Sequence, residues 1–520
     1  MALLTVVTTS VPYVSIGDWG LVTRLPVVFW CGLSSLLVLV YLCMKSRTWR
    51  SIVFILTITY LYAVPTLIQE NAMLLGVSYP AAEGKLISIE GRLVPDNYDI
   101  YRYHNFPGFL YFVAILTSLT GVPLSILCKY VPLLLVTLFG LLIYLVLRTK
   151  LKTQEAFAGT LWFLGSFWMI DGNYFSPQEF SFASFALTFL IFTWLFLNSK
   201  AQGMSRRLMI VAVILFASCT FTHVLTSVVI LSYLIPVLAL HRTGIRGTRL
   251  IMFMLLLAFE FLYLVFYAYP FLEYAGLKTL EELPGLFNLQ FARVQRAGLQ
   301  TQILTNASRL LIMAISGAIA LLFIIVLILK RSMQNDKYWL LSLGGISLPA
   351  LISAYGASEM LIRLFMFALF PLVYFCVKLI RNKKRILCMI VCILLVLHFP
   401  AHYGGALVEG VATSELAGAS FCIMNVPRTI SYFSLTSRTT FHIWFQEPAS
   451  FSPPVSLSSL STMNETSVMT ALKEIRLVIY SQADVYWFLY YHGSVPIGES
   501  ILEQQFDKVY DNPFIKIFRR

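Results

Sequence analysis

Charged side chains are scarce in this 520-residue chain. Only 12% of its residues are Asp, Glu, Lys or Arg, whereas 58% are hydrophobic, and the mean hydropathy is +0.78. Soluble domains carry about 25% charged residues, so this composition excludes an ordinary soluble globular protein. The chain is expected to be an integral membrane protein that crosses the bilayer many times.

The sequence also lacks the cysteine spacings that are typical of zinc sites or disulfide frameworks. It has eight cysteines and no CxxC motif, so neither kind of site is expected. The net charge of +13 does not indicate nucleic-acid binding, because the basic residues form short clusters between apolar runs. Such clusters are typical of cytoplasmic loops. No nucleic-acid partner is expected.

The basic clusters predict the orientation of the chain in the membrane. The link KSRTWR at 45–50 is expected in the cytoplasm, which places residues 68–104 outside. Two apolar runs follow, 105–121 and 130–147, and then the basic link RTKLK. If both runs crossed the membrane, RTKLK would lie outside, against the positive-inside rule. One of the two runs is therefore expected not to cross.

The run 105–121 is the better candidate to stay on the outer side. It is short, begins at Pro107-Gly108 and ends at Gly121-Val122-Pro123, so we predict a helix in the outer interface. With that choice the chain has about twelve crossings and both termini outside. The expected spans lie near 27–44, 51–67, 130–147, 156–170, 181–197, 208–224, 225–241, 250–269, 310–329, 340–356, 364–380 and 386–402.

Two domains are predicted. Residues 1–402 form the transmembrane domain, whose first outer loop is 68–129, and 403–520 form a small extracytoplasmic α/β domain, because the composition turns to Ser, Thr, Asn and Pro after His402. The closing KVYDNPFIKIFRR predicts a β-hairpin that turns at residues 511–513. The predicted fold class is an all-α polytopic membrane protein with an outer interfacial helix and this α/β appendage.

In this topology several polar side chains gather on the outer face. Carboxylates on separate loops could act as general bases on a sugar hydroxyl or hold a divalent cation, and an arginine at the outer end of a helix suits a lipid-linked phosphate. The same residues have plainer interpretations as turn, capping or snorkelling residues. The set comprises Asp96, Asp99, Arg102, His104, Asp171, Tyr174, Gln178, Glu179, His223, Glu359 and Arg363.

Four stretches carry a resemblance to a known family. An acidic outer first loop precedes NFPGFLYFVAILTSLTG at 105–121 and a span with a basic end, YVPLLLVTLFGLLIYLVLRTK at 130–150; the turns NYFSPQ and THVLTS follow. This order resembles the GT-C superfamily of polyprenyl-phosphate-sugar-dependent membrane glycosyltransferases, most closely its distant archaeal members. The sequence departs from the superfamily in having no clear Asp-x-Asp or Asp-Glu pair and no WWD-type motif. A monosaccharide transferase, or a relative without activity, is therefore expected rather than an enzyme that transfers oligosaccharides to protein.

The resemblance implies roles for individual residues. Asp99 or Asp96 matches the first-loop catalytic acid, with Asp99 slightly favoured, and Asp171 matches a carboxylate that, with Asp99, could hold Mg or Mn. Arg363 matches an arginine that grips the lipid phosphate. The substrate-binding set is completed by Arg102, His104, Tyr174, Gln178, His223 and Glu359. The implied reaction is hexosyl or pentosyl transfer from a polyprenyl- or dolichyl-phosphate-linked donor to a lipid, glycan or protein acceptor, on the extracytoplasmic side of the plasma membrane.

Two alternatives stay open. A lipid-linked oligosaccharide polymerase or ligase is typically rich in arginine on its large outer loops, and the loop before residue 310 carries Arg293, Arg296 and Arg309. A transporter without enzymatic activity would instead show internal repeats and charges deep in its spans. Glu260, within LLLAFEFLYLVF, is the only obvious charge of that kind, and it could simply pair with a neighbouring helix.

Overall fold

The computed structural model describes most of the chain, with gaps. The described residues are 20–23, 25–43, 47–69, 71–72, 79–93, 103–168, 174–197, 202–238, 246–273, 300–329, 336–351, 357–404, 413–425, 432–434, 477–481, 502–503, 506–511 and 515–519. Asp96, Asp99, Arg102 and Asp171 lie outside these residues.

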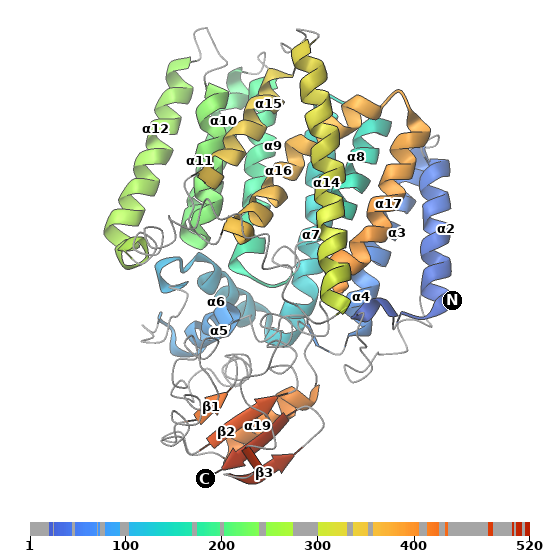
Figure 1. The fold of residues 1–520 in the computed structure, drawn as a ribbon. Helices are drawn as coiled ribbons and strands as arrows, with labels where there is room; N and C mark the ends of the chain where they lie inside the picture. The colour runs from blue at the N-terminus through green and yellow to red at the C-terminus, as the bar shows by residue number, and fades with distance from the viewer. Residues whose placement is uncertain are drawn as a thin grey trace.

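The main body is a bundle of roughly parallel helices, and a small sheet lies beyond one of its ends (Figure 1). The helices of the bundle are α2 (Val27–Cys43), α3 (Arg47–Ile58), α4 (Val64–Ile68), α7 (Leu124–Arg148), α8 (Thr153–Ser166), α9 (Pro177–Leu197), α10 (Gln202–Thr222), α11 (Val224–Leu238), α12 (Arg246–Leu262), α14 (Gln300–Leu329), α15 (Lys337–Ser347), α16 (Ala357–Ile380) and α17 (Lys384–Tyr403). Two π-helical turns, Thr59–Ala63 and Tyr263–Tyr267, continue α3 and α12.

Within the described residues, seven helical segments are long and apolar enough to cross a membrane. They are Trp49–Ile68, Leu124–Arg148, Pro177–Leu197, Leu250–Tyr267, Ile303–Leu329, Arg363–Ile380 and Lys384–Tyr403. Four shorter helices are also apolar: Val27–Leu42, Gly108–Thr120, Arg207–Thr222 and Val224–Leu238. An integral membrane protein is thus confirmed, whereas the number of about twelve crossings stays a prediction.

Helices α9 and α16 form the centre of the bundle. Their apolar windows are 72% and 83% buried, whereas the corresponding window of α12 is only 22% buried. The two central helices meet through aromatic rings, with Phe185 and Phe367 at a centroid separation of 4.8 Å and an interplanar angle of 81°. Edge-to-face pairs of this kind add about 0.5–1.5 kcal/mol to the free energy gained by burial. Residues at the ends of α9 and α16 are therefore carried by the two most buried of these candidate spans.

The run predicted to stay out of the bundle forms α6 (Gly108–Thr120), which packs on α5 (Tyr79–Glu90). Both helices lie beneath one end of the bundle (Figure 1). Helix α6 begins directly after Pro107 and ends at Gly121, whose φ of 63° is the left-handed conformation that favours glycine. Phe112 of α6 stacks on Phe180 of α9 with ring centroids 4.3 Å apart, which fixes the hairpin of α5 and α6 against the start of α9.

The C-terminal part forms a small α/β unit beneath α5 and α6 (Figure 1). Its sheet has the order β1-β2-β4-β3, with β1 parallel to β2 and the other pairs antiparallel. The strands are β1 (Tyr432–Ser434), β2 (Leu477–Ser481), β3 (Asp507–Asp511) and β4 (Ile515–Arg519), and α19 (Thr413–Asn425) packs on β4. The pairing of β3 with β4 confirms the predicted closing hairpin.

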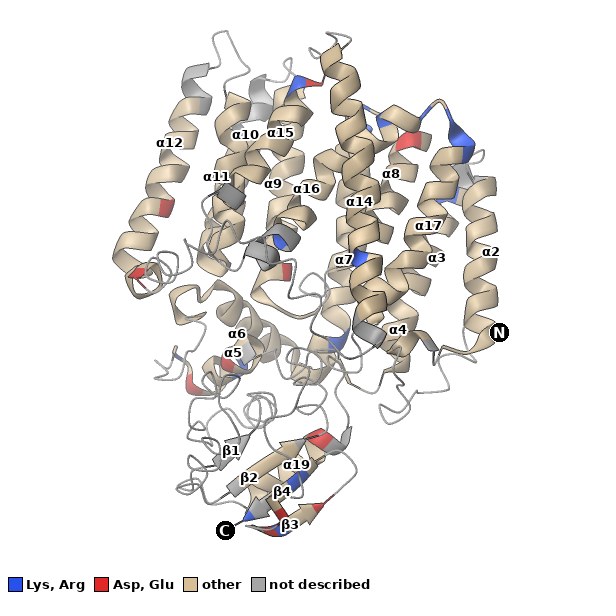
Figure 2. Cartoon of the chain, viewed as in Figure 1, with Lys and Arg blue, Asp and Glu red and all other residues tan. Residues whose placement is uncertain are grey.

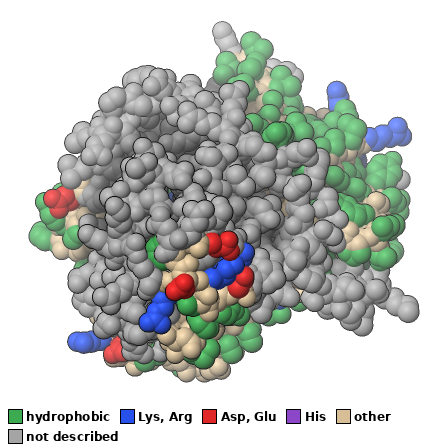
Figure 3. Space-filling view, turned by 60° about the horizontal axis from the view of Figure 1, so that its bottom comes forward, with side chains coloured by type: hydrophobic (Ala, Val, Ile, Leu, Met, Phe, Trp, Pro, Cys, Tyr) green, Lys and Arg blue, Asp and Glu red, His purple; other side chains and the backbone are tan. Residues whose placement is uncertain are grey.

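The surface of this unit carries charges of both signs, which lie side by side in Figure 3. Lys508 contacts Glu503 at 2.7 Å and Asp511 at 3.2 Å, and these pairs raise the pKa of Lys508. Mixed, exposed charges of this kind favour solubility and contribute little to stability. The described part of the unit thus has a surface suited to water.

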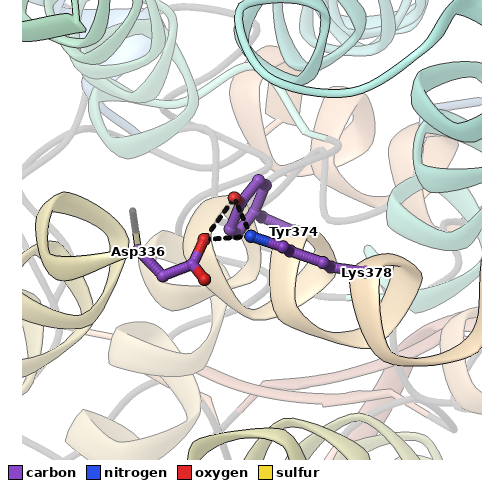
Figure 4. A network of polar contacts seen from close by, with 3 residues as sticks. All are labelled: Asp336, Tyr374 and Lys378. Atoms are coloured by element: carbon purple, nitrogen blue, oxygen red, sulfur yellow. Dashed lines mark hydrogen bonds and ion pairs between the residues drawn. The ribbon is translucent and has the colours of Figure 1, made fainter. Parts of the chain in front are cut away.

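The opposite end of the bundle holds many of the basic residues (Figure 2). It carries the links from α7 to α8, with Arg148 and Lys152, and from α16 to α17, with Arg381 and Lys384. Slightly inside this end, the buried Asp336 accepts hydrogen bonds from the Tyr374 hydroxyl, at 2.6 Å, and from Lys378 (Figure 4). The charge of Asp336 is thereby paired, as a buried carboxylate requires.

Candidate functional site

Helix α9 brings two predicted residues to the end of the bundle that faces α5 and α6. The helix begins at Pro177, four residues before the predicted boundary, because Ser176 caps it: the Glu179 backbone N–H donates to Ser176 Oγ at 3.1 Å. Gln178 and Glu179 therefore lie in the first helical turn and not in a loop. Tyr174, three residues before the helix, is half-buried.

Gln178 and Glu179 are buried polar groups without partners. Gln178 is 5% exposed and Glu179 is 0% exposed, and Gln178 Nε2 and both Glu179 carboxylate oxygens make no hydrogen bond to any described residue. An unpaired buried carboxylate or amide costs several kcal/mol in a protein interior. Groups of this kind are retained where a ligand satisfies them, so the start of α9 is a candidate binding site.

His223 lies at the tight turn between α10 and α11. Its Nδ1 is 3.0 Å from Thr226 Oγ1, and Thr226 is 2.8 Å from Ser181 Oγ of α9. Burial, and then the positive charge of Arg363, lower the pKa of His223 to about 3. The imidazole is therefore neutral at pH 7 and can accept or donate one hydrogen bond through the nitrogen that Thr226 does not contact.

Arg363 stands in the first turns of α16, close enough to His223 to repel its protonated form. Arg363 and Phe367 are four residues apart on α16, as Gln178 and Phe182 are on α9. Because Phe182 and Phe367 are in contact at 5.4 Å, and residues four apart share a helix face, Arg363 and Gln178 are expected at the same level of facing helices. The Arg363 guanidinium and the neutral His223 imidazole thus lie close together, and the unpaired Gln178 amide is expected beside them.

His104 takes a different place from the other predicted residues. It lies in a 3-10 turn before α6, and its Nε2 is 2.9 Å from Glu83 Oε2 of α5. The side chains are 16% and 5% exposed, so the pair is largely withdrawn from water. It links α5 to the residues that lead into α6, which indicates that His104 holds the two helices together.

Two polar residues deeper in the bundle, Glu260 and Arg309, have hydrogen-bond partners. Glu260 accepts hydrogen bonds from Thr220, at 2.5 Å, and from Ser227, at 2.7 Å. It therefore pairs with neighbouring helices, which is the plainer of the two interpretations given for it above. Arg309 donates from Nε to the Ala401 carbonyl at 2.8 Å and lies over the Trp168 ring at 4.9 Å. Both residues have structural partners, and neither Arg293 nor Arg296 lies in the described residues.

Sequence reasoning did not single out Glu83, and it placed Glu179 in a loop without a separate role. The only sequence signal for Glu83 was a charge in the otherwise weakly polar YPAAEGKLISIE. Glu359 lies in α16, but its side chain is outside the described part of the chain. Its predicted pair with Arg363 stays a prediction, as do the roles of Asp96, Asp99, Arg102 and Asp171.

The described residues contain no group of three or more His, Cys, Asp or Glu side chains that could hold a metal ion. The carboxylates predicted to bind one, Asp99 and Asp171, lie outside them. The described donors at this end, Glu179 and the pair of Glu83 with His104, do not form a divalent-cation site, which usually needs several converging oxygen ligands. No step of the chemistry is therefore derived through a metal.

Comparison with known proteins supports the fold. No family model and no curated protein matches the sequence. Among solved structures, the oligosaccharyltransferase of Archaeoglobus fulgidus tethered to an acceptor peptide aligns with a TM-score of 0.54 at 11% identity, over 87% of this chain and 72% of that one. The same archaeal enzyme, AglB, in complex with an inhibitory peptide and a dolichol-phosphate aligns with a TM-score of 0.52 at 12% identity, over 89% and 71%.

ArnT from Cupriavidus metallidurans, bound to undecaprenyl phosphate, aligns with a TM-score of 0.43 at 13% identity over 91% of this chain and 98% of that one. The fold assignment rests on the archaeal enzyme, whose scores are higher. Identities near 12% establish likeness of fold and not of activity. The resemblance seen in the sequence is thus confirmed at the level of the fold, which this chain shares with the archaeal oligosaccharyltransferase.

Proposed function

We propose that this protein is a membrane glycosyltransferase that moves a single sugar from a polyprenyl-phosphate-linked donor to an acceptor on the extracytoplasmic side. The observation that carries the proposal is the closeness of Arg363 to neutral His223, at the end of the bundle where α9 begins with the unpaired Gln178 amide. The archaeal oligosaccharyltransferase structures, one in complex with a dolichol-phosphate and one tethered to an acceptor peptide, support a lipid-linked donor.

The three side chains suit the donor headgroup. A guanidinium can bind two phosphate oxygens through its planar fork, and it would oppose the negative charge that grows on the phosphate as the sugar leaves. Neutral His223 and the Gln178 amide can hydrogen-bond sugar hydroxyls. His223 stays neutral in this place because it is buried and because the positive charge of Arg363 disfavours a second positive charge beside it.

The chemistry then needs a base for the acceptor. In the proposed reaction the acceptor oxygen attacks the anomeric carbon, its proton passes to a carboxylate, and the bond from that carbon to the lipid phosphate oxygen breaks. We assign the base to Asp99 or Asp96 from the family resemblance. A positioned carboxylate base contributes about 10²- to 10⁴-fold to such a rate. Glu179 is a further carboxylate at this end of the bundle, placed to hold an acceptor hydroxyl or amine.

Donor binding is the quantity that tests this proposal. Purified protein is expected to retain a polyprenyl phosphate detectable by mass spectrometry, and Arg363→Ala should weaken binding of a short-chain prenyl phosphate about tenfold to a hundredfold. That is the range for losing a charge-assisted contact worth about 1.5–3 kcal/mol. Arg363→Lys should recover part of the loss, since lysine keeps the charge but not the fork.

Arg92→Ala is the matched control, because Arg92 is exposed and lies on the hairpin of α5 and α6 at the same end of the bundle. It should leave binding of the prenyl phosphate unchanged. If Arg363→Ala binds the prenyl phosphate as tightly as the wild type while keeping its thermal stability, Arg363 does not hold the donor phosphate and the proposal loses its main support.

A further inference from the structure

A cavity lies apart from Arg363, where α5, α6 and the start of α7 meet the C-terminal unit. Its volume is about 630 Å³, which is in the range of small-molecule and headgroup sites. The cavity is lined by Lys85, Ser88 and Ile89 of α5, by Thr117, Ser118 and Gly121 at the end of α6, by Val122 to Ser125, and by Leu416 of α19.

Among the described residues that line this cavity, Lys85 is the one charged side chain, and it is half-buried. It makes no ion pair with any carboxylate of the described residues; the nearby Glu83 is occupied by His104. The Ser118 and Ser125 hydroxyls likewise have no hydrogen-bond partner in the described part of the chain. An unpaired ammonium beside free hydroxyl donors suits an anion with several oxygens. The first turn of the long helix α7, which also lines the cavity, favours the same charge.

The surroundings indicate that the anion belongs to a lipid. The cavity opens beside apolar side chains that are exposed, with Leu119 81%, Ile89 63% and Ile115 57% accessible. Ile126 and Tyr130 continue this strip along α7. Exposed apolar residues in such numbers at the end of a transmembrane bundle are expected to face acyl or prenyl chains. A free anion would gain nothing from them.

We propose that this cavity binds the phosphate headgroup of a bilayer phospholipid, with Lys85 as its cation and the acyl chains lying along the apolar strip of α6 and α7. The proposal does not rest on the glycosyltransferase assignment, because it uses none of the residues at the start of α9 or α16. Leu416 lines the cavity and packs against the apolar residues of α5, α6 and α7. An occupied cavity would therefore also contact the C-terminal unit.

The test measures binding to the whole purified protein in a non-ionic detergent, with three probes: dihexanoyl phosphatidic acid, a ten-carbon prenyl phosphate and inorganic phosphate. Lys85→Gln should weaken binding of phosphatidic acid about tenfold, as expected for one charge-assisted contact. Loss for the prenyl phosphate alone would make the cavity part of the donor site and would overturn the proposal of a separate phospholipid site.

Two further variants make the test specific. Ser118→Phe places a ring in the cavity from an exposed position, so it should block the lipid without unfolding the protein. Arg92→Gln removes an exposed charge outside the cavity and should change nothing. Equal affinity of wild type and Lys85→Gln for both lipid phosphates overturns the proposal, and so does inorganic phosphate that binds as tightly as the lipids. Arg363→Ala, measured alongside, reports separately on the donor site.

Discussion

At the end of the bundle that faces α5 and α6, burial determines the charge state and the hydrogen bonding of each polar residue. His223 and Arg363 lie close together, and burial, followed by the charge of the arginine, keeps the imidazole neutral by lowering its pKa. Gln178 and Glu179, in contrast, are removed from water with nothing described to satisfy them. His223 and Arg363 can contact a negatively charged ligand that carries hydroxyl groups. Gln178 and Glu179 lack hydrogen-bond partners that such a ligand could supply. These properties of the four residues are the reason to propose a substrate site at the starts of α9 and α16.

The lowered pKa of His223 predicts an acid-sensitive stability. The folded pKa is about 3 and the unfolded value is about 6.5, so the unfolded chain takes up the proton first as the pH falls. The stability that neutral His223 contributes is complete above about pH 6.5 and is lost progressively toward pH 3. At pH 5 the loss is roughly 2 kcal/mol.

His223→Asn removes the titrating group while keeping an oxygen that can accept from Thr226. Thermal unfolding in detergent should show the wild type losing more stability than His223→Asn between pH 7 and pH 5. Parallel curves for the two proteins would mean that His223 is protonated with an ordinary pKa, and the neutral imidazole would have to be abandoned.

At the scale of elements, the close approach of α5 and α6 positions the hairpin under the bundle. Gly84 makes that approach achievable, because a Cβ at this residue would lie 2.5 Å from Val113 Cβ and 2.8 Å from the Leu110 carbonyl oxygen. On its other side, α6 meets α9 through Phe112 and Phe180. A shift of α5 would therefore be transmitted through α6 to the helix that carries Gln178 and Glu179.

Gly84→Ala should destabilise the protein by about 1–3 kcal/mol, the usual cost of overpacking. The matched control is Gly317→Ala in α14, where an added Cβ meets nothing within 4 Å and the substitution should stabilise the helix by up to about 1 kcal/mol. Unfolding monitored by circular dichroism compares the two. Equal stabilities of both variants would show that α5 and α6 are not held at contact distance.

At the scale of the whole molecule, the ends of the bundle differ in charge and in covering. One end carries the basic links around Arg148 and Lys384, and the other is covered by α5, α6 and the C-terminal unit (Figures 1 and 2). Because basic links are retained in the cytoplasm, the covered end is expected outside. The donor site and the Lys85 cavity would then both open to the extracytoplasmic side.

Single cysteines at the two ends of α7 test this orientation. Ser125 and Lys150 are both exposed, so Ser125→Cys and Lys150→Cys, in a background without other accessible cysteines, should fold normally. An impermeant thiol reagent added outside intact cells should label position 125 at once and position 150 only after the membrane is opened. Labelling of position 125 from the cytoplasmic side alone would reverse the assignment of both faces.

The local properties of the sequence determined the class of this protein, the places of its apolar bundle helices and the exclusion of residues 105–121 from the bundle, but did not indicate α5 or α19. Hydropathy, proline and glycine act within a few residues, so Pro107 and Gly121 mark the ends of α6 without reference to the rest of the chain. The closing β-hairpin was predictable for the same reason. Such signals named His223, Gln178 and Arg363 as polar residues near one face, but not as neighbours.

Only the tertiary structure decided which of these residues meet. His223 and Arg363 are brought together because α9 packs on α16 through aromatic rings and Ser181 ties α9 to Thr226 beside His223. His104 pairs with Glu83 because α5 folds back on α6, and its role in binding substrate stays a prediction. Contacts of this kind depend on how apolar helix faces pack over the whole bundle. The spacing of residues along one helix does not determine which other helix will pack against it.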